Sequence, residues 1–356
     1  TYQYYNTAFP AGADKMVLYK DAGEVAMHSA PEDTGKDLAL SFRSSTFGSG
    51  SHTTASQNAF NLLYKCVDVY RSTGYYQNFS YAHNLMSYRH TRAHNSLLVN
   101  GIGQPYSTEG YGSVMRAMGG QHISYCLGDA SHAYRSISND PMWVDYFKQA
   151  GIEQTPENGF GATPLTKYRR HVLLLHPHTV IVYDELEASE AVRWEWLLHS
   201  PTEFKIDAVK KTLSTDNKTK GWVAVTQLFG GHVFTLSQTD RFVVPPAITG
   251  AEYPNQWHLT ARVDGCSATR FLAIIQVGDE AVSIINRDGD TFNVGDWTIK
   301  AVLDASKAPE LTVSHRTEQA VFSYGTDNPA LNGNFYSRQY TGSSLLYDEI
   351  DGAYQV

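Results

Sequence analysis

The chain lacks several features that would place it in a functional class at once. No apolar run approaches the roughly 20 residues that a membrane-spanning helix needs, so we expect no membrane partner. Its three cysteines show no CxxC spacing, which argues against a disulfide framework or a zinc knuckle. Neither a glycine-rich phosphate loop nor a GxSxG nucleophile elbow occurs. No basic-then-apolar leader precedes Thr1, so we expect either a processed N-terminus or a piece of a longer protein.

Acidic residues are missing from one long stretch. The 356 residues carry 36 acidic and 28 basic side chains, a net charge of −8 that argues against a nucleic-acid partner. Between Asp68 and Glu109, however, there is no Asp or Glu. The arginines and histidines of this stretch are Arg71, His83, Arg89, His90, Arg92 and His94, and six tyrosines accompany them. Such a surface attracts carboxylates or sulfates, and aromatic rings offer flat faces to sugars.

The residue pattern predicts an all-β fold. Hydrophobic residues make up 42% of the chain and charged residues 18%, a balance that excludes intrinsic disorder. Short runs rich in β-branched and aromatic residues alternate with turn signals such as Asn100-Gly101 and Asp264-Gly265. No long segment has helical periodicity. We therefore expect antiparallel sheets packed face to face, and a long loop over residues 137–166.

Several short motifs follow one another in a recognisable order. The first group consists of FRSSTFGSGSH at 42–52, QNAF at 57–60, STGYY at 72–76, TRAHNS at 91–96 and NGIGQ at 100–104. A second group consists of GDAS at 128–131, RRHV at 169–172, VYDEL at 182–186 and WLLH at 196–199. In order and spacing these motifs resemble the β-sandwich region of heparinase II/III-like polysaccharide lyases, especially the branch of oligoalginate lyases and exo-acting heparin lyases.

The resemblance implies both a fold and a reaction. Family members carry an α/α toroid before this β-region, and the active site lies in the cleft between the two. This sequence contains no toroid, so we expect the C-terminal portion of a larger enzyme. We assign a large β-sandwich domain, a super-sandwich, to residues 1–306 and a small C-terminal β segment to residues 307–356. The implied activity is cleavage of uronic-acid-containing glycans by β-elimination, which needs a base, an acid and donors that neutralise the uronate carboxylate.

The resemblance also implies site residues. His52 matches the family's catalytic histidine, as a base or as a neutralising donor. No Asp or Glu lies between Asp37 and Asp68, so no carboxylate near it in the sequence holds it as an imidazolium. We expect one of the two arginines beside the Ala-His-Asn element to reach the substrate carboxylate and the other to pair with a distant acid. The predicted substrate-binding residues are Gln57, Asn58, Tyr76, His83, Arg89, Arg92, His94 and Asn95. The tyrosine that acts as acid would come from the toroid.

No metal or other cofactor is expected. In zinc-containing members the Ala-His-Asn histidine is a ligand, together with a histidine two residues after the catalytic one and an aspartate in the following strand. These positions hold His94, Thr54 and either Arg71 or Ser72 in this sequence. Two of the three protein ligands are therefore replaced, although structural zinc takes four N, S or O donors.

Three functions remain open at this point. We favour a lyase acting on alginate oligosaccharides, because the acid-free stretch holds three arginines but no lysine, and sulfated substrates usually draw more cationic residues. The alternatives are an exo-acting heparin or heparan sulfate lyase and a non-catalytic carbohydrate-binding β-sandwich. From the family we expect the bacterial periplasm, with the cytoplasm as the alternative.

Overall fold

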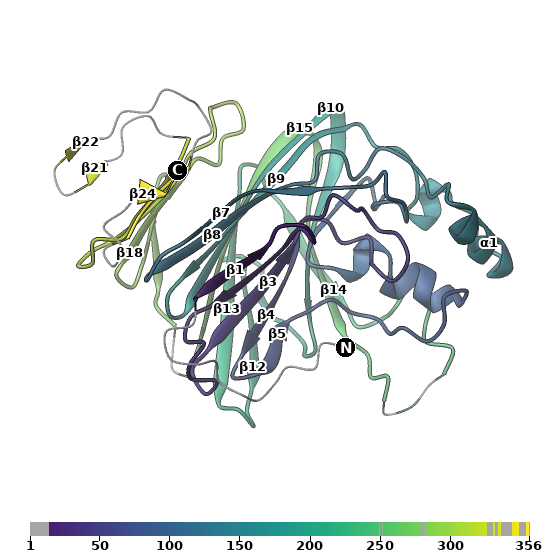
Figure 1. The fold of residues 1–356 in the computed structure, drawn as a ribbon, viewed down its shortest axis with the longest axis horizontal. Helices are drawn as coiled ribbons and strands as arrows, with labels where there is room; N and C mark the ends of the chain where they lie inside the picture. Colours follow the sequence, from purple (N-terminus) through teal and green to yellow (C-terminus); the bar gives the residue numbers. More distant parts are fainter. Residues whose placement is uncertain are drawn as a thin grey trace.

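The computed structural model describes residues 14–248, 250, 252–279, 282–325, 330–331, 334–335, 344–348 and 354–355. Within these residues strands dominate, and they form sheets of five, ten, seven and two strands. The predicted all-β fold, with large antiparallel sheets and a smaller C-terminal sheet, is confirmed (Figure 1).

The elements have the following bounds. The five-stranded sheet contains β1 (Met16–Tyr19), β2 (Glu24–His28), β3 (Leu38–Arg43), β4 (Ala59–Tyr64) and β5 (Val67–Tyr70). The large sheet contains β6 (Leu97–Val99), β7 (Ser113–Gly119), β8 (Ile123–Asp129), β9 (Leu165–Leu175), β10 (Thr179–Ser200), β11 (Lys205–Asp207), β12 (Thr212–Asn217), β13 (Trp222–Gly230), β14 (Thr235–Thr239) and β15 (Trp257–Gly278).

The remaining strands follow in chain order. The C-terminal sheet contains β16 (Ile285–Asp288), β17 (Thr291–Val294), β18 (Trp297–Ala301), β19 (Leu311–His315), β20 (Val321–Tyr324), β23 (Ser344–Tyr347) and β24 (Tyr354–Gln355), and a two-stranded sheet contains β21 (Ala330–Leu331) and β22 (Asn334–Phe335). The helices are α1 (Pro141–Gln149), the π-helix η1 (Asn84–Tyr88) and the 3₁₀ turns η2 (Thr91–Ala93) and η3 (Pro156–Asn158).

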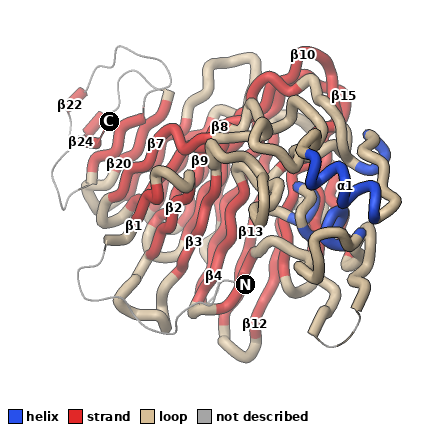
Figure 2. Tube along the Cα trace, turned by 45° about the vertical axis from the view of Figure 1, so that its right-hand side comes forward, coloured by secondary structure: helices blue, strands red, loops and turns tan. Residues whose placement is uncertain are grey.

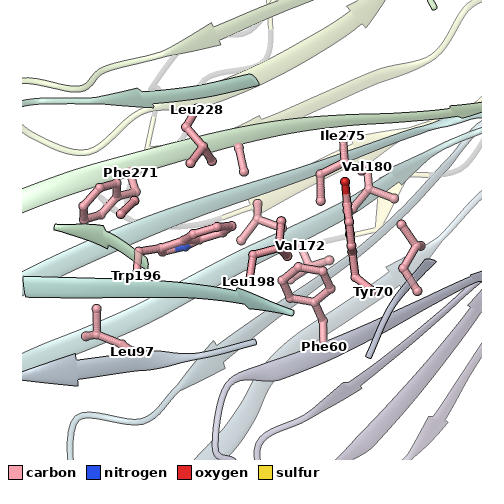
Figure 3. Close-up of a cluster of buried hydrophobic side chains, with 14 of the residues drawn as sticks. Phe60, Tyr70, Leu97, Val172, Val180, Trp196, Leu198, Leu228, Phe271 and Ile275 are labelled. Atoms are coloured by element: carbon pink, nitrogen blue, oxygen red, sulfur yellow. The ribbon is translucent and has the colours of Figure 1, made fainter. Parts of the chain in front are cut away.

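The large sheet is covered on both faces, which gives the molecule three layers. In β9, Val172 and Leu174 belong to the core shared with the five-stranded sheet, whereas Leu173 and Leu175 belong to the core shared with the C-terminal sheet. Successive side chains on a strand point to opposite faces, so a strand covered on both sides needs an unbroken apolar run. Figure 3 shows part of the first core, with Phe60 of β4 beside Val172.

A buried ion pair lies within the first core. Arg170 of β9 and Asp184 of β10 are paired across the two strands, and both are almost fully buried. The guanidinium donates two hydrogen bonds to the carboxylate, at 2.7 and 2.8 Å. Burial alone would lower the pKa of Arg170, but the adjacent Asp184 carboxylate raises it above its ordinary value. Trp196 Nε1 adds a third hydrogen bond to Asp184 at 2.9 Å, so the buried charge is fully solvated by protein groups.

A second polar network joins the large sheet to the C-terminal sheet. Tyr324 of β20 donates its hydroxyl to the Glu185 carboxylate of β10 at 2.8 Å, and His171 Nε2 lies 2.9 Å from the same oxygen. Burial would raise the pKa of Glu185, but His171, Lys167 and Tyr324 together lower it to about 2. The carboxylate therefore stays charged at neutral pH and anchors the outer layer.

The predicted division at residues 306/307 falls inside the C-terminal sheet. β18 and β19 lie on opposite sides of it and pair with each other, and the sheet already begins at Ile285. Arg270 of β15 donates hydrogen bonds to the carbonyl oxygens of Val302 and Lys307, one on each side of the division. As a domain boundary, 306/307 stays a prediction.

The predicted loop over 137–166 contains the helix α1. The side chain of Asp140 accepts a hydrogen bond from Met142 N at 2.9 Å, and Pro141 occupies the first turn. Trp143 and Phe147, four residues apart, bury the same face of this helix. Figure 2 shows the helices gathered at one end of the sheets. Among the described residues, no helix is long and apolar enough to cross a membrane.

The buried ion pair yields a stability prediction. We expect Arg170→Met to lower the free energy of unfolding by about 3–5 kcal/mol, because it leaves the Asp184 carboxylate buried without its counter-charge. Urea denaturation followed by circular dichroism measures this change. The control is Arg262→Met, which removes the solvent-exposed pair between Arg262 and Asp264 and should lower the free energy of unfolding far less, because water screens an exposed ion pair. Equal losses in the two variants would contradict the prediction.

Candidate active site

His52 lies on an exposed turn between β3 and β4. Thr53 N donates to Gly50 O at 3.1 Å, and Arg43 Nη2 donates to Gly48 O at 2.8 Å, so the turn is fixed from both ends. Gly48 has a φ of +62°, and a Cβ atom there would lie 2.3 Å from the carbonyl oxygen of Ser107. Only glycine therefore fits at this close approach.

Two aromatic rings flank the imidazole. The ring of His52 lies 4.9 Å from that of Phe79 and 6.2 Å from that of Tyr76, centroid to centroid. Tyr76 is 46% exposed, so this pair of predicted site residues shares one accessible surface. Within the described part of the chain, no ion pair involves His52. The accessible part of the site is thus an imidazole beside a phenol, without a local carboxylate.

The other predicted residues following His52 point inward. The side chain of Gln57 accepts a hydrogen bond from Ser45 N at 2.7 Å and donates one to Gly48 O at 3.1 Å. Asn58 Nδ2 lies 3.3 Å from the carbonyl oxygens of both Gly128 and Tyr168. Both amides are buried, and in this structure they hold the His52 turn against the large sheet.

The segment that carries Tyr76 is braced by residues far along the chain. His83 is buried; it contacts Val244 O through Nδ1 at 2.6 Å and accepts a hydrogen bond from Tyr75 N at 3.1 Å. Burial lowers the pKa of His83, so it is neutral at pH 7 and can serve as donor and acceptor at once. Gln256 accepts from Gly74 N at 2.8 Å. Sequence patterns do not predict the contacts of His83 with Val244 and of Gly74 with Gln256, because the two residues of each pair are more than 150 positions apart in the chain.

The two arginines have different surroundings. Arg92 donates to Asn158 O at 2.6 Å and to His90 Nδ1 at 3.1 Å. Among the described residues, no acid forms an ion pair with Arg89 or with Arg92, so the expected pairing of one of them with a distant acid is not formed. Arg89 is fully buried and donates one hydrogen bond, to the carbonyl oxygen of Thr53. Burial lowers the pKa of Arg89 to about 10, so it remains charged at neutral pH.

The Ala-His-Asn element is also buried. His94 Nδ1 lies 2.8 Å from Ser72 Oγ. Asn95 donates to Phe60 O at 2.9 Å and accepts from His199 N at 2.7 Å. Of the nine predicted residues, His52 and Tyr76 are exposed, Arg92 is half-buried and the other six are buried. Their roles in substrate binding stay predictions.

The chain matches one family of known proteins. The family described as "Heparinase II/III-like, C-terminal" matches residues 12–240. This chain belongs to that family. A search of curated proteins gives no match. The match covers the five-stranded sheet, the His52 turn and most of the large sheet, and it confirms the family that the sequence motifs predict.

Solved structures show the same fold. A heparinase III, the BT4657 gene product, has a TM-score of 0.58 at 12% identity, over 96% of this chain and 43% of its own. The heparan sulfate lyase HepC from Pedobacter heparinus has a TM-score of 0.57 at 13% identity, over 85% of this chain and 41% of its own. The chain thus spans less than half the length of these structures.

The residues present do not fit the zinc ion that occurs in some members of the family. His94 is the one histidine at the predicted ligand positions, and its neighbour there is the neutral hydroxyl of Ser72. Arg43 and Arg89 are close enough for their charges to lower the pKa of His94 further, which disfavours a bound cation. Among the described residues, no group of three His, Cys, Asp or Glu side chains could hold a metal.

The buried histidines behind the site make its stability depend on pH. Burial lowers the pKa of His94 to about 3 and that of His258 to about 4, whereas a histidine in the unfolded chain titrates near 6.5. The unfolded state therefore binds protons first as the pH falls. The domain therefore has its full free energy of unfolding above pH 6.5. As the pH falls from 7 to 5, the neutral form of each buried histidine lowers this free energy by about 2 kcal/mol.

We therefore expect His94→Gln to reduce the difference in unfolding free energy between pH 7 and pH 5 by about 2 kcal/mol. Urea denaturation at the two pH values measures it. His132→Gln, at an exposed histidine, controls for the loss of a histidine as such. An unchanged pH dependence in His94→Gln would show that His94 takes up its proton over the same pH range in the folded and unfolded chains, and would contradict the prediction.

Proposed function

We propose that this domain is the β-sandwich part of a polysaccharide lyase that cleaves uronic-acid-containing glycans by β-elimination. The observation that supports the proposal is the exposed His52 beside the exposed Tyr76, both within the residues that match the heparinase II/III-like C-terminal family. An imidazole without a carboxylate partner is suited to accept the proton beside the uronate carboxylate. His52 is accordingly the candidate catalytic residue.

The remaining parts of the reaction need groups from outside this chain. β-Elimination requires an acid at the leaving oxygen and donors that neutralise the carboxylate. Of the two arginines beside the Ala-His-Asn element, Arg89 is buried and Arg92 donates hydrogen bonds to Asn158 and His90. We therefore propose that an α/α toroid, N-terminal to this domain in the whole enzyme, closes the cleft over His52 and supplies the acid. The solved structures, of which this chain covers 41–43%, are long enough to carry such a domain.

For the substrate we propose alginate oligosaccharides. The acid-free stretch from Val69 to Thr108 contains three arginines and no lysine, which suits a carboxylate-only polymer better than a sulfated one. Heparin or heparan sulfate is the second candidate, and the solved structures named as heparinase III and heparan sulfate lyase favour it. We place the enzyme in the bacterial periplasm, with the cytoplasm as the alternative.

The proposal predicts a large effect of His52. His52→Ala in the full-length enzyme should lower turnover by about 10²–10⁴-fold, the range for a positioned acid–base group. The assay is the ultraviolet absorbance of the unsaturated product. Unfolding should be unchanged, because His52 is exposed. The control is His232→Ala, another exposed histidine, which contacts Thr269 at 3.2 Å and lies outside the predicted site. Normal turnover in His52→Ala would remove His52 from the mechanism.

Product analysis separates the functions that remain open. The full-length enzyme should release unsaturated uronate oligosaccharides from alginate, and mass spectrometry of the products identifies them. Activity on heparan sulfate alone would reject the alginate assignment but keep the lyase. Binding of either polymer without any unsaturated product would favour a carbohydrate-binding module. This chain without its toroid should be inactive or nearly so on both polymers.

A further inference from the structure

Arg89 is a buried cation without an acidic partner. Its side chain is fully buried, and its Nε and Nη2 groups have no hydrogen-bond partner. No ion pair of the described residues includes it, in contrast to Arg170, which binds Asp184. Leaving such a charge buried is costly, since charged groups are normally paired when they leave water. Something else must offset this cost.

Aromatic rings surround the guanidinium instead. It lies 4.2 Å from the ring centroid of Trp143, 5.7 Å from that of Phe79 and 5.9 Å from that of Tyr106. Cations over aromatic faces are stabilised by the ring quadrupole, most strongly over tryptophan and away from water. Trp143 lies in α1, within the segment that the sequence predicts to be a loop, and it provides the closest of these rings.

The same residue reaches the His52 turn by three routes. The guanidinium donates to the carbonyl oxygen of Thr53, the residue after His52. The backbone oxygen of Arg89 accepts a hydrogen bond from Ala55 N at 3.0 Å. Phe79, which packs against the guanidinium, also contacts the imidazole ring of His52 at 4.9 Å. His52 itself is exposed, so these contacts add buried support to a turn that Arg43 and Gln57 hold through Gly48.

We propose that Arg89 is the positioning residue of the site, and that its aromatic-bound guanidinium holds the His52 turn in place through Thr53 and Phe79. The effect of Arg89 on catalysis rests on the proposed function. The position of His52, however, can be measured by a method that needs no enzymatic activity. Arg89 acts through His52 and not by contact with the substrate, since its side chain is buried beneath the turn.

The test combines histidine NMR of this domain with kinetics of the full-length enzyme. In Arg89→Met the domain should fold, and the ¹³Cε1–H signal of His52, assigned by its absence in His52→Gln, should move toward that of an exposed histidine in a peptide. The signals of buried His171 and His199 should stay in place. In the enzyme, kcat should fall about 10- to 100-fold, as for a misplaced catalytic group, with KM changed less than about threefold.

The control and a second variant keep the outcome decisive. Arg270→Met removes another buried arginine that bonds backbone carbonyls, and should leave the His52 signal and kcat unchanged. Arg89→Lys keeps the charge among the rings but loses the planar fork, and should give intermediate values for both.

The possible results separate the two ideas. If the His52 signal moves in Arg89→Met but the full-length enzyme shows no lyase activity, the positioning role is supported and the proposed function is rejected. An unmoved His52 signal in Arg89→Met, or wild-type values in both variants, would overturn the positioning role. Failure of both variants to fold would also overturn it, because Arg89 would then be a residue of the core.

Discussion

The guanidinium of Arg170 connects the core of the domain to the site. Two of its nitrogens bind Asp184, and Nη1 donates to the carbonyl oxygens of Asn58 at 2.8 Å and Asn95 at 2.7 Å. Asn58 ends the turn that carries His52, and Asn95 ends the segment that carries Tyr76. One buried charge therefore fixes where both segments end relative to the large sheet, and its geometry allows little freedom because four of its N–H groups donate to buried acceptors.

Two buried arginines of the domain are stabilised in different ways. Arg170 is neutralised by a carboxylate, which makes it a rigid point of the core. Arg89 is held by aromatic rings from the Tyr76 segment, from α1 and from the loop after β6. Its charge stays unneutralised close to the accessible surface. Since anionic sugars bind where positive potential is not cancelled, this arrangement agrees with the acid-free stretch from which the functional interpretation began.

The sequence predicts the sheets better than the details of the site. Apolar runs such as Val172–Leu175 show that a strand is buried on both faces, so the sandwich can be predicted. The Asp264-Gly265 turn signal, however, lies inside β15, a single strand of 22 residues, so this signal did not mark the end of a strand. Gln57 and Asn95 match family motifs, yet whether an amide faces solvent or a backbone carbonyl depends on contacts distant in the chain. Such contacts leave no local periodicity.

Coverage of the large sheet on both faces has a consequence for preparing the domain. A chain cut at residue 306 would retain β18 and lose its neighbour β19, together with Tyr324, which binds Glu185. Part of the apolar face to which residues such as Leu173 and Ile274 belong would then meet water, and exposed sheet faces of this kind lead to aggregation. Insolubility of a shortened protein would therefore result from the loss of its outer layer and say nothing about the His52 turn, which connects β3 and β4 of the five-stranded sheet.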